Sequence, residues 1–166
     1  MPYPVEIDEN ELIVRVVRSP YHLNKSESRL TPSAFRPPPG RRDLSVIRWR
    51  YTIPDGRELK TKIRSIGNCA EARYKGLAAL IASECLAANV ELVDSREQFL
   101  GHADILMPYA VPNHEPADGS IADTLAAIRA ALRDAAKYHP DPAPEAQLWT
   151  IDELPPPCDQ SPIRSI

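Results

Sequence analysis

Apolar residues recur along this chain with two spacings, every second residue as in a strand and every three to four residues as in a helix. The first half of the chain favours strands. Residues 12–18 form a continuous run rich in β-branched side chains, which predicts a central strand. From residue 46 to residue 53 apolar and polar positions alternate, which predicts a strand with one aromatic-aliphatic face and one partly basic face. Residues 54–57 form a turn signal, so we interpret residues 59–64 as the hairpin partner of that strand.

The second half of the chain favours helices. Apolar residues recur at three- and four-residue steps through residues 69–88, which predicts a long helix with Asn68 as its N-cap. Gly76 inside that helix costs about 1 kcal/mol relative to Ala, so we expect it to mark the close approach of a neighbouring element. Residues 90–94 then predict a short buried strand, and the apolar stripe of residues 121–136 predicts the last helix.

Eighteen prolines against six glycines predict rigid, irregular connections between short elements. In one of them, Thr31 and Pro32 predict a single helical turn. The expected fold is α+β: a single domain with a mainly antiparallel sheet of about four strands, two main helices and long Pro-rich loops. The strands are expected near residues 12–18, 44–53, 58–64 and 90–94, and the helices near residues 69–88 and 120–138. This domain spans residues 11–150, between a loose acidic leader at 1–10 and a Pro-rich tail at 151–166.

Composition narrows the class of protein. No stretch approaches the twenty apolar residues that a membrane span requires, and the N-terminus lacks the basic-then-apolar pattern of a signal peptide. The three cysteines, Cys69, Cys85 and Cys158, have no zinc-site spacing and suit a reducing compartment. We therefore expect a cytoplasmic protein with no membrane partner.

Charge is divided unevenly between the two halves of the chain. Residues 11–75 carry fifteen Lys and Arg against six Asp and Glu, whereas residues 76–166 carry five against fourteen. Such asymmetry is typical of a basic half that binds an anionic partner. It is equally consistent with two halves that face each other in the folded protein, and the sequence leaves both interpretations open.

The sharpest polar cluster of the sequence is Gly101-His102-Ala103-Asp104. In an extended segment His102 and Asp104 point to one face, which suits a metal ion or a general base with its orienting acid. His114 is a candidate third group. The alternative is that His102 and Asp104 have only structural hydrogen bonds. We take His102, Asp104 and His22 as candidate catalytic residues, and we expect no metal and no cofactor, since Walker, dinucleotide-binding and His-Glu-x-x-His motifs are missing from the sequence.

A second cluster combines the long loop of residues 19–36 with the predicted hairpin. Long loops within compact domains are usually functional or disordered, and this one carries Tyr21, His22 and Lys25 and is followed by Ser45. The candidate residues for binding an anion or a nucleic acid are basic side chains of this region: Arg36, Arg41, Arg42, Arg48, Arg50, Lys60 and Lys62.

Two resemblances follow from these motifs. The S-x-F-R-P pattern at residues 33–37, the Leu-Ser-Val strand at 44–46 and the His-Ala-Asp at 102–104 resemble a scattered group of small uncharacterised bacterial proteins, which implies no particular activity. An Arg-bearing first strand, a later Ser-bearing strand and a helix are similar to the ADP-ribosyltransferase-like fold, although the glycine and tyrosine landmarks of that fold are missing here. That resemblance implies nicotinamide dinucleotide held by Arg15 or His22 and Ser45, with Glu71 or Asp104 as the acid.

Two classes of function stay open on the sequence. The first is a non-enzymatic accessory or interaction protein of a bacterial multi-component system, which binds a protein partner or an anionic partner through its basic face. The second is a small enzyme, either a phosphate-handling hydrolase or a ribosyltransferase-like toxin. The enzyme requires the loop of residues 21–36 to converge with His102 and Asp104, whereas the adaptor requires only a contiguous exposed patch.

Overall fold

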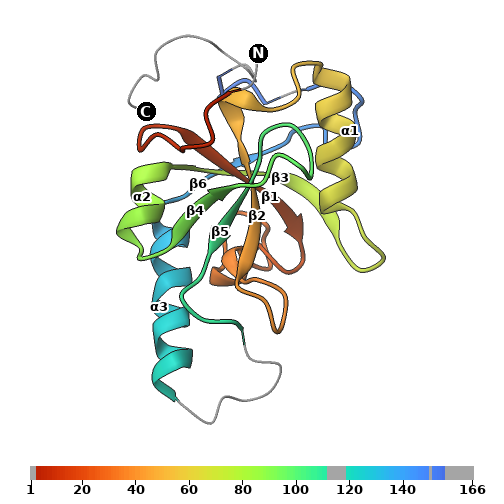
Figure 1. The fold of residues 1–166 in the computed structure, drawn as a ribbon. Coiled ribbons are helices and arrows are strands. Elements are labelled where there is room, and N and C mark those ends of the chain that lie inside the picture. Colours follow the sequence, from red (N-terminus) through yellow and green to blue (C-terminus); the bar gives the residue numbers. More distant parts are fainter. Residues whose placement is uncertain (1–2, 112–118, 150, 156–166) are drawn as a thin grey trace.

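One antiparallel sheet of six strands forms the centre of the molecule (Figure 1). The structure, a computed structural model, describes residues 3–111, 119–149 and 151–155. The strands follow the spatial order β4-β5-β2-β1-β3-β6 and comprise β1 (Leu12–Ser19), β2 (Asp43–Arg48), β3 (Arg73–Ile81), β4 (Glu91–Asp94), β5 (His102–Leu106) and β6 (Lys137–Pro140). The helices are α1 (Gly56–Gly67), α2 (Ala82–Ala87) and α3 (Gly119–Ala135), and two 3-10 turns are η1 (Pro32–Phe35) and η2 (Trp49–Tyr51).

Both faces of the sheet are covered by apolar cores, which explains why its central strands are rich in apolar residues. Side chains alternate along β1, so that Ile13 and Val17 join one core and Val14 and Val16 join the other. The first core is completed by buried residues of α2, α3 and η1, and the second by Leu59 and Ile63 of α1 together with a few other residues. A strand that is buried on both faces reads as a nearly continuous hydrophobic run, as residues 12–17 do with the single exception of Arg15.

The α+β class and the antiparallel sheet are confirmed, but within the described residues the sheet has six strands instead of four, and there are three helices instead of two. The strands near residues 12–18 and 90–94 and the helix near 120–138 lie where the sequence predicts them. The single turn at η1 is also confirmed, with Thr31 at its N-cap position and Pro32 in its first turn.

The predicted long helix at residues 69–88 is wrong: residues 73–81 form strand β3, and only residues 82–87 form a helix, α2. Residues 76–80 are all buried between the two cores, and a continuous apolar run fits a central strand as well as it fits a helix. Asn68 ends α1 instead of starting a helix, and its side chain accepts the Tyr74 amide at 2.8 Å. The close approach predicted for Gly76 is confirmed, because a Cβ atom there would lie 2.3 Å from the carbonyl oxygen of His139 on β6.

The predicted strand at residues 58–64 is also wrong, because this segment belongs to helix α1. The side chain of Asp55 accepts the amides of Arg57 and Glu58 at 3.0 and 2.9 Å, and this cap starts the helix within the predicted turn. The predicted strand at 44–53 is shorter than expected, since β2 ends at Arg48 and continues as η2.

The N-terminal segment, expected to be a loose leader, is tied to the sheet by Arg48. The guanidinium of Arg48 is completely buried and donates to both carboxylate oxygens of Glu11, at 2.9 and 2.6 Å, and to Asp94 at 2.7 Å. It also donates to the carbonyl oxygens of Pro4 and Glu6. In addition, the ring of Tyr3 stacks on Tyr51 with centroids 4.7 Å apart.

The beginning of the expected Pro-rich tail also contacts the domain. Ile151 and Leu154 are buried in the second core, and the carbonyl oxygen of Pro155 accepts the indole N–H of Trp49 at 2.8 Å. Residues 156–166, which hold the rest of that tail, lie outside the described residues. Among the helices that the structure describes, none has the length and apolarity that crossing a membrane requires.

Candidate functional site

Strands β1 and β2 diverge soon after they begin to pair, and this divergence opens a cleft. Their pairing is confined to Ile13 opposite Arg48 and Val14 opposite Ile47. Beyond this point β1 continues along β3 while β2 continues along β5. The resulting cleft has a volume of about 220 Å³. Residues from β1, β2, the following loops and the end of α1 line it: Arg15, Val16, Arg18, His22, Pro38, Arg41, Asp43, Leu44, Ser45, Ile66 and Gly67.

Two arginines of β1 bring positive charge into this cleft. Arg15 spans the divergence, since its Nη1 donates to the carbonyl oxygen of Ser45 at 2.9 Å and its Nε donates to that of Ala34 at 3.1 Å. Burial, with a further contribution from the neighbouring Arg18, lowers the pKa of Arg15 to about 10. The Nε of Arg18 is buried and, within the described part of the chain, has no hydrogen-bond partner.

The third arginine of the cleft, Arg41, is exposed and paired. Its guanidinium contacts the Asp43 carboxylate at 2.9 and 2.5 Å, and this interaction raises the pKa of Arg41. By contrast, no carboxylate within the described ranges forms an ion pair with Arg15 or Arg18. The cleft therefore carries a net positive charge that the described side chains do not neutralise.

His22 lines the cleft with an uncharged imidazole ring. Its Nδ1 accepts the backbone amide of Arg18 at 3.1 Å, so the ring proton lies on Nε2. Burial first, and then the charges of Arg15 and Arg18, lower the pKa of His22 to about 3. In this site His22 therefore acts as a fixed hydrogen-bond donor and does not serve as a proton shuttle near neutral pH.

The low pKa of His22 makes stability depend on pH. The unfolded chain protonates this ring near its ordinary pKa of 6.5, whereas the folded chain does so only near 3. The free energy of unfolding is therefore expected to fall as the pH drops through this window, by up to about 1.4 kcal/mol per pH unit from this group. Urea unfolding of the wild type and of His22→Asn, which keeps an acceptor for the Arg18 amide, checks this result. Equal pH slopes in both proteins would contradict it.

A chain of hydrogen bonds through His102 reaches the same cleft. Asp94 lies opposite Ala103 in the pairing of β4 with β5, so the next residues, Ser95 and His102, face each other. The Ser95 hydroxyl lies 2.6 Å from His102 Nδ1, and the Ser45 hydroxyl lies 3.2 Å from His102 Nε2. Ser95 and His102 are buried, whereas Ser45 is exposed in the cleft.

A narrow apolar crevice joins the cleft to His102. It shares Val16, Ser45 and Ile66 with the cleft and is also lined by Phe99 and His102. The ring of Phe99 meets that of His102 edge-on, with centroids 4.8 Å apart. The exposed serine thus has a basic pocket on one side and a buried imidazole with apolar neighbours on the other.

No family model, curated protein or solved structure matches this chain.

The structure brings some of the predicted catalytic residues together. His22 lines the cleft, and His102 reaches it through Ser45, but both ring nitrogens of His102 contact serine hydroxyls in place of the expected Asp104. Asp104 is half-buried and lies opposite Ser45 in the register of β2 with β5. His114 lies outside the described residues. No group of His, Cys, Asp and Glu suited to a metal ion occurs in the part of the chain that the structure describes.

The predicted basic surface does not exist as one surface. Arg48 and Lys60 are completely buried and paired with carboxylates, and these contacts remove both from any exposed anion site. Arg42 donates to the carbonyl oxygen of Met107 at 2.8 Å, and Lys62 lies over the ring of Phe99 at 4.7 Å.

The remaining three predicted anion-binding residues are also dispersed. Arg36 is exposed next to Arg129 of α3, whose pKa is lowered by burial and by Arg36. Of the seven basic residues predicted to bind an anion, Arg41 alone lines the cleft. Arg50 lines a different hollow. Of the two arginines that converge in the cleft, Arg15 was named only through the resemblance to the ADP-ribosyltransferase-like fold, and Arg18 was not predicted as a binding residue.

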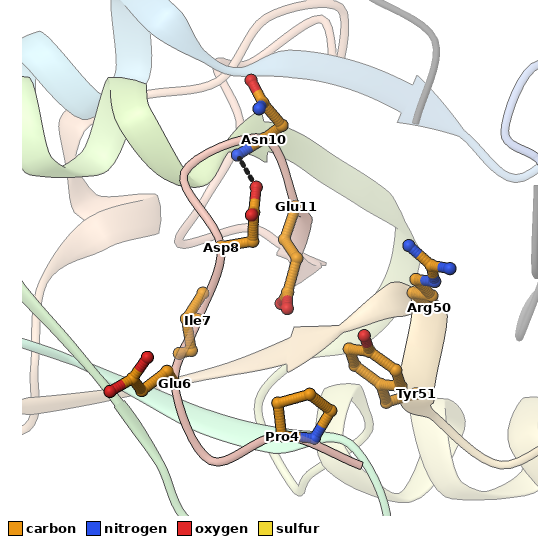
Figure 2. A pocket seen from close by; sticks show the side chains of 8 residues that line it. All are labelled: Pro4, Glu6, Ile7, Asp8, Asn10, Glu11, Arg50 and Tyr51. Carbon is orange, nitrogen blue, oxygen red and sulfur yellow. Dashed lines mark hydrogen bonds between the residues drawn. The ribbon is translucent and has the colours of Figure 1, made fainter. Parts of the chain in front are cut away.

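The hollow at Arg50 is larger than the cleft, at about 470 Å³, and Figure 2 shows its lining. The N-terminal segment forms most of that lining, and Arg50 and Tyr51 close it. Two of its three acidic side chains have roles in the fold: Glu11 pairs with Arg48, and Asp8 accepts the amide of Asn10 at 2.8 Å. Among the described residues that line this hollow, none is a serine, a cysteine or a histidine.

Proposed function

We propose that this chain is an anion-binding module whose ligand places a phosphate or carboxylate group in the cleft between β1 and β2. The observation that carries the proposal is the pair Arg15 and Arg18, two partly buried cations without a carboxylate partner among the described residues. Buried charge is costly unless it is paired. An anion with several acceptor oxygens would supply the missing charge and would accept from the unused guanidinium donors.

The size of the cleft limits the class of ligand. A volume of about 220 Å³ is smaller than the roughly 300–1,000 Å³ of pockets for drug-sized molecules. It suits one small anionic group and the atoms next to it. This proposal narrows the sequence-based expectation of an interaction protein with a basic face, because the ligand site is a small cleft instead of an extended surface.

Binding is expected to depend on both arginines of β1. Isothermal titration with inorganic phosphate, pyrophosphate, ADP and NAD⁺ would find the preferred ligand, with NAD⁺ included because of the resemblance to ribosyltransferases. Each of Arg15→Met and Arg18→Met is expected to weaken binding of that ligand about 10- to 150-fold, since a hydrogen bond to a charged group contributes about 1.5–3 kcal/mol.

Arg57→Met is the matched control, because Arg57 is exposed in the first turn of α1 and does not line the cleft. It removes one positive charge without changing the site, so its affinity should equal that of the wild type. Equal losses in all three variants would contradict the proposal. Tight binding of DNA with steep salt dependence, insensitive to Arg15→Met, would instead indicate an extended basic surface.

A further inference from the structure

We propose that Ser45 and His102 form the nucleophile and general base of a hydrolase that cleaves small carboxylic esters bearing a negatively charged group. The inference rests on the proposed function, because the arginines of the cleft would hold that charged group. It goes beyond binding, since it assigns a reaction to the hydroxyl at the other side of the same cleft.

The first argument is the geometry of the pair. A serine hydroxyl is a weak nucleophile unless a base within hydrogen-bond reach takes its proton. The Oγ of Ser45 lies 3.2 Å from Nε2 of His102, and Ser45 is exposed in the cleft while His102 is buried behind it. The reactive atom is thus open to a ligand and the base is shielded from water.

The second argument is the contact on the far side of the imidazole. A catalytic histidine needs its other nitrogen fixed, so that the nitrogen facing the nucleophile can accept a proton. The hydroxyl of Ser95, buried 2.6 Å from Nδ1, can accept the proton of that nitrogen. We assign Ser95 as a positioning residue, and its place is fixed because its amide donates to the His102 carbonyl oxygen at 3.0 Å.

The third argument is the surroundings of the serine. The guanidinium of Arg15 donates to the Ser45 carbonyl oxygen at 2.9 Å, so a positive charge lies next to the backbone of the proposed nucleophile. Val16, Ile66 and Phe99 provide an apolar wall beside Ser45 and His102. A small ester with a charged end matches the cleft of about 220 Å³, whereas the apolar crevice, at about 10 Å³, shields the imidazole and holds no part of the ester.

The reaction balances with water as the only co-reactant. Ser45 Oγ attacks the ester carbonyl carbon and His102 Nε2 takes the hydroxyl proton. The tetrahedral intermediate collapses, the bond from carbon to the leaving oxygen breaks, and His102 returns the proton to that oxygen. Water, deprotonated by His102, then attacks the acyl carbon on Ser45. The bond from that carbon to Ser45 Oγ breaks, His102 returns the proton to Oγ, and the carboxylic acid leaves. No redox step occurs.

The test uses the full chain with mono-4-nitrophenyl succinate, an anionic ester, and 4-nitrophenyl butyrate, its neutral counterpart. We expect faster hydrolysis of the anionic ester, and a loss of about 10³-fold in kcat in both Ser45→Ala and His102→Gln. Ser33→Ala, which changes an exposed serine outside the cleft, should retain full activity.

Arg15→Met should raise KM for the anionic ester more than for the neutral one. Ser95→Ala should shift the midpoint of the pH–rate profile, which a purely structural role would not do.

Covalent labelling separates the two proposals. A fluorophosphonate should modify the wild type at Ser45, located by mass spectrometry of the peptide, and should not modify Ser45→Ala. Because Ser45 is exposed, Ser45→Ala should fold normally and still bind the anion of the titration experiment. Anion binding without turnover or labelling would overturn the hydrolase and leave the binding module. Turnover that persists in Ser45→Ala would also overturn it.

Discussion

Replacing Arg48 with methionine is expected to lower the free energy of unfolding by about 3–5 kcal/mol. The substitution keeps much of the side-chain volume but leaves the carboxylates of Glu11 and Asp94 buried without their cation. It also removes the donor to Pro4 and Glu6, which ties the N-terminal segment to the sheet. Since a small domain is stable by only about 5–15 kcal/mol, this loss is a large share of the total.

Chemical unfolding monitored by circular dichroism measures this effect, and limited proteolysis would show whether residues 3–10 detach first. Arg41→Met is the matched control, because Arg41 also pairs with a carboxylate, that of Asp43, but in an exposed position. An exposed ion pair contributes about 0–1 kcal/mol. Similar losses in the two variants would show that burial does not determine the strength of these contacts.

Ion pairs of this kind partly explain why the first half of the chain is basic and the second half acidic. Arg48 binds Asp94, and Arg64 binds Glu145 at 2.9 Å, so basic residues of the first half meet acidic residues of the second half. The alternative that the two halves face each other therefore holds for these residues. Inside the cleft, Arg15 and Arg18 form no ion pair with a described carboxylate, and this site is smaller than a basic half of the chain implies.

The sequence predicted correctly those elements whose apolar pattern fits either a strand or a helix but not both. Residues 12–18 are β-branched and could hardly form a helix, and α3 repeats its buried positions Leu125, Ile128 and Leu132 at helical spacing. Segment 73–81 is different, because Ala favours a helix on its own and the apolar run has no period. Its strand conformation is decided by its neighbours β1 and β6, which local propensity does not include.

The site could be predicted only in part, because its residues come from distant points of the chain. Ser45 and His102 meet across 57 residues, and the pairing of β2 with β5 that joins them depends on the whole sheet. The sequence did single out His102 and His22 as reactive types. The resemblance to the ADP-ribosyltransferase-like fold also named Arg15, His22 and Ser45, which line the cleft. Residue patterns did not predict the cleft itself, because the divergence of β1 from β2 leaves no local pattern.

Lys60→Met is the second substitution with a large expected effect, again about 3–5 kcal/mol. Lys60 lies on α1 with its ammonium group completely buried against the Asp141 carboxylate, and it also donates to the carbonyl oxygen of Ala143 at 3.2 Å. Asp141 in turn accepts the Tyr74 hydroxyl at 2.7 Å, and burial together with this carboxylate raises the pKa of Tyr74. Without Lys60 a carboxylate stays buried between α1 and the residues that follow β6.

A double-mutant cycle tests whether this buried charge is the cause. In Lys60→Met/Asp141→Asn the carboxylate is neutral, and an amide oxygen can still accept the Tyr74 hydroxyl, so part of the stability lost in Lys60→Met should return. Lys62→Met is the control on the same helix, where the ammonium lies over Phe99 and is only half-buried; its loss should stay below about 1 kcal/mol. If the double variant is less stable than Lys60→Met alone, the cost arises from lost packing around Lys60, and the buried charge is not its source.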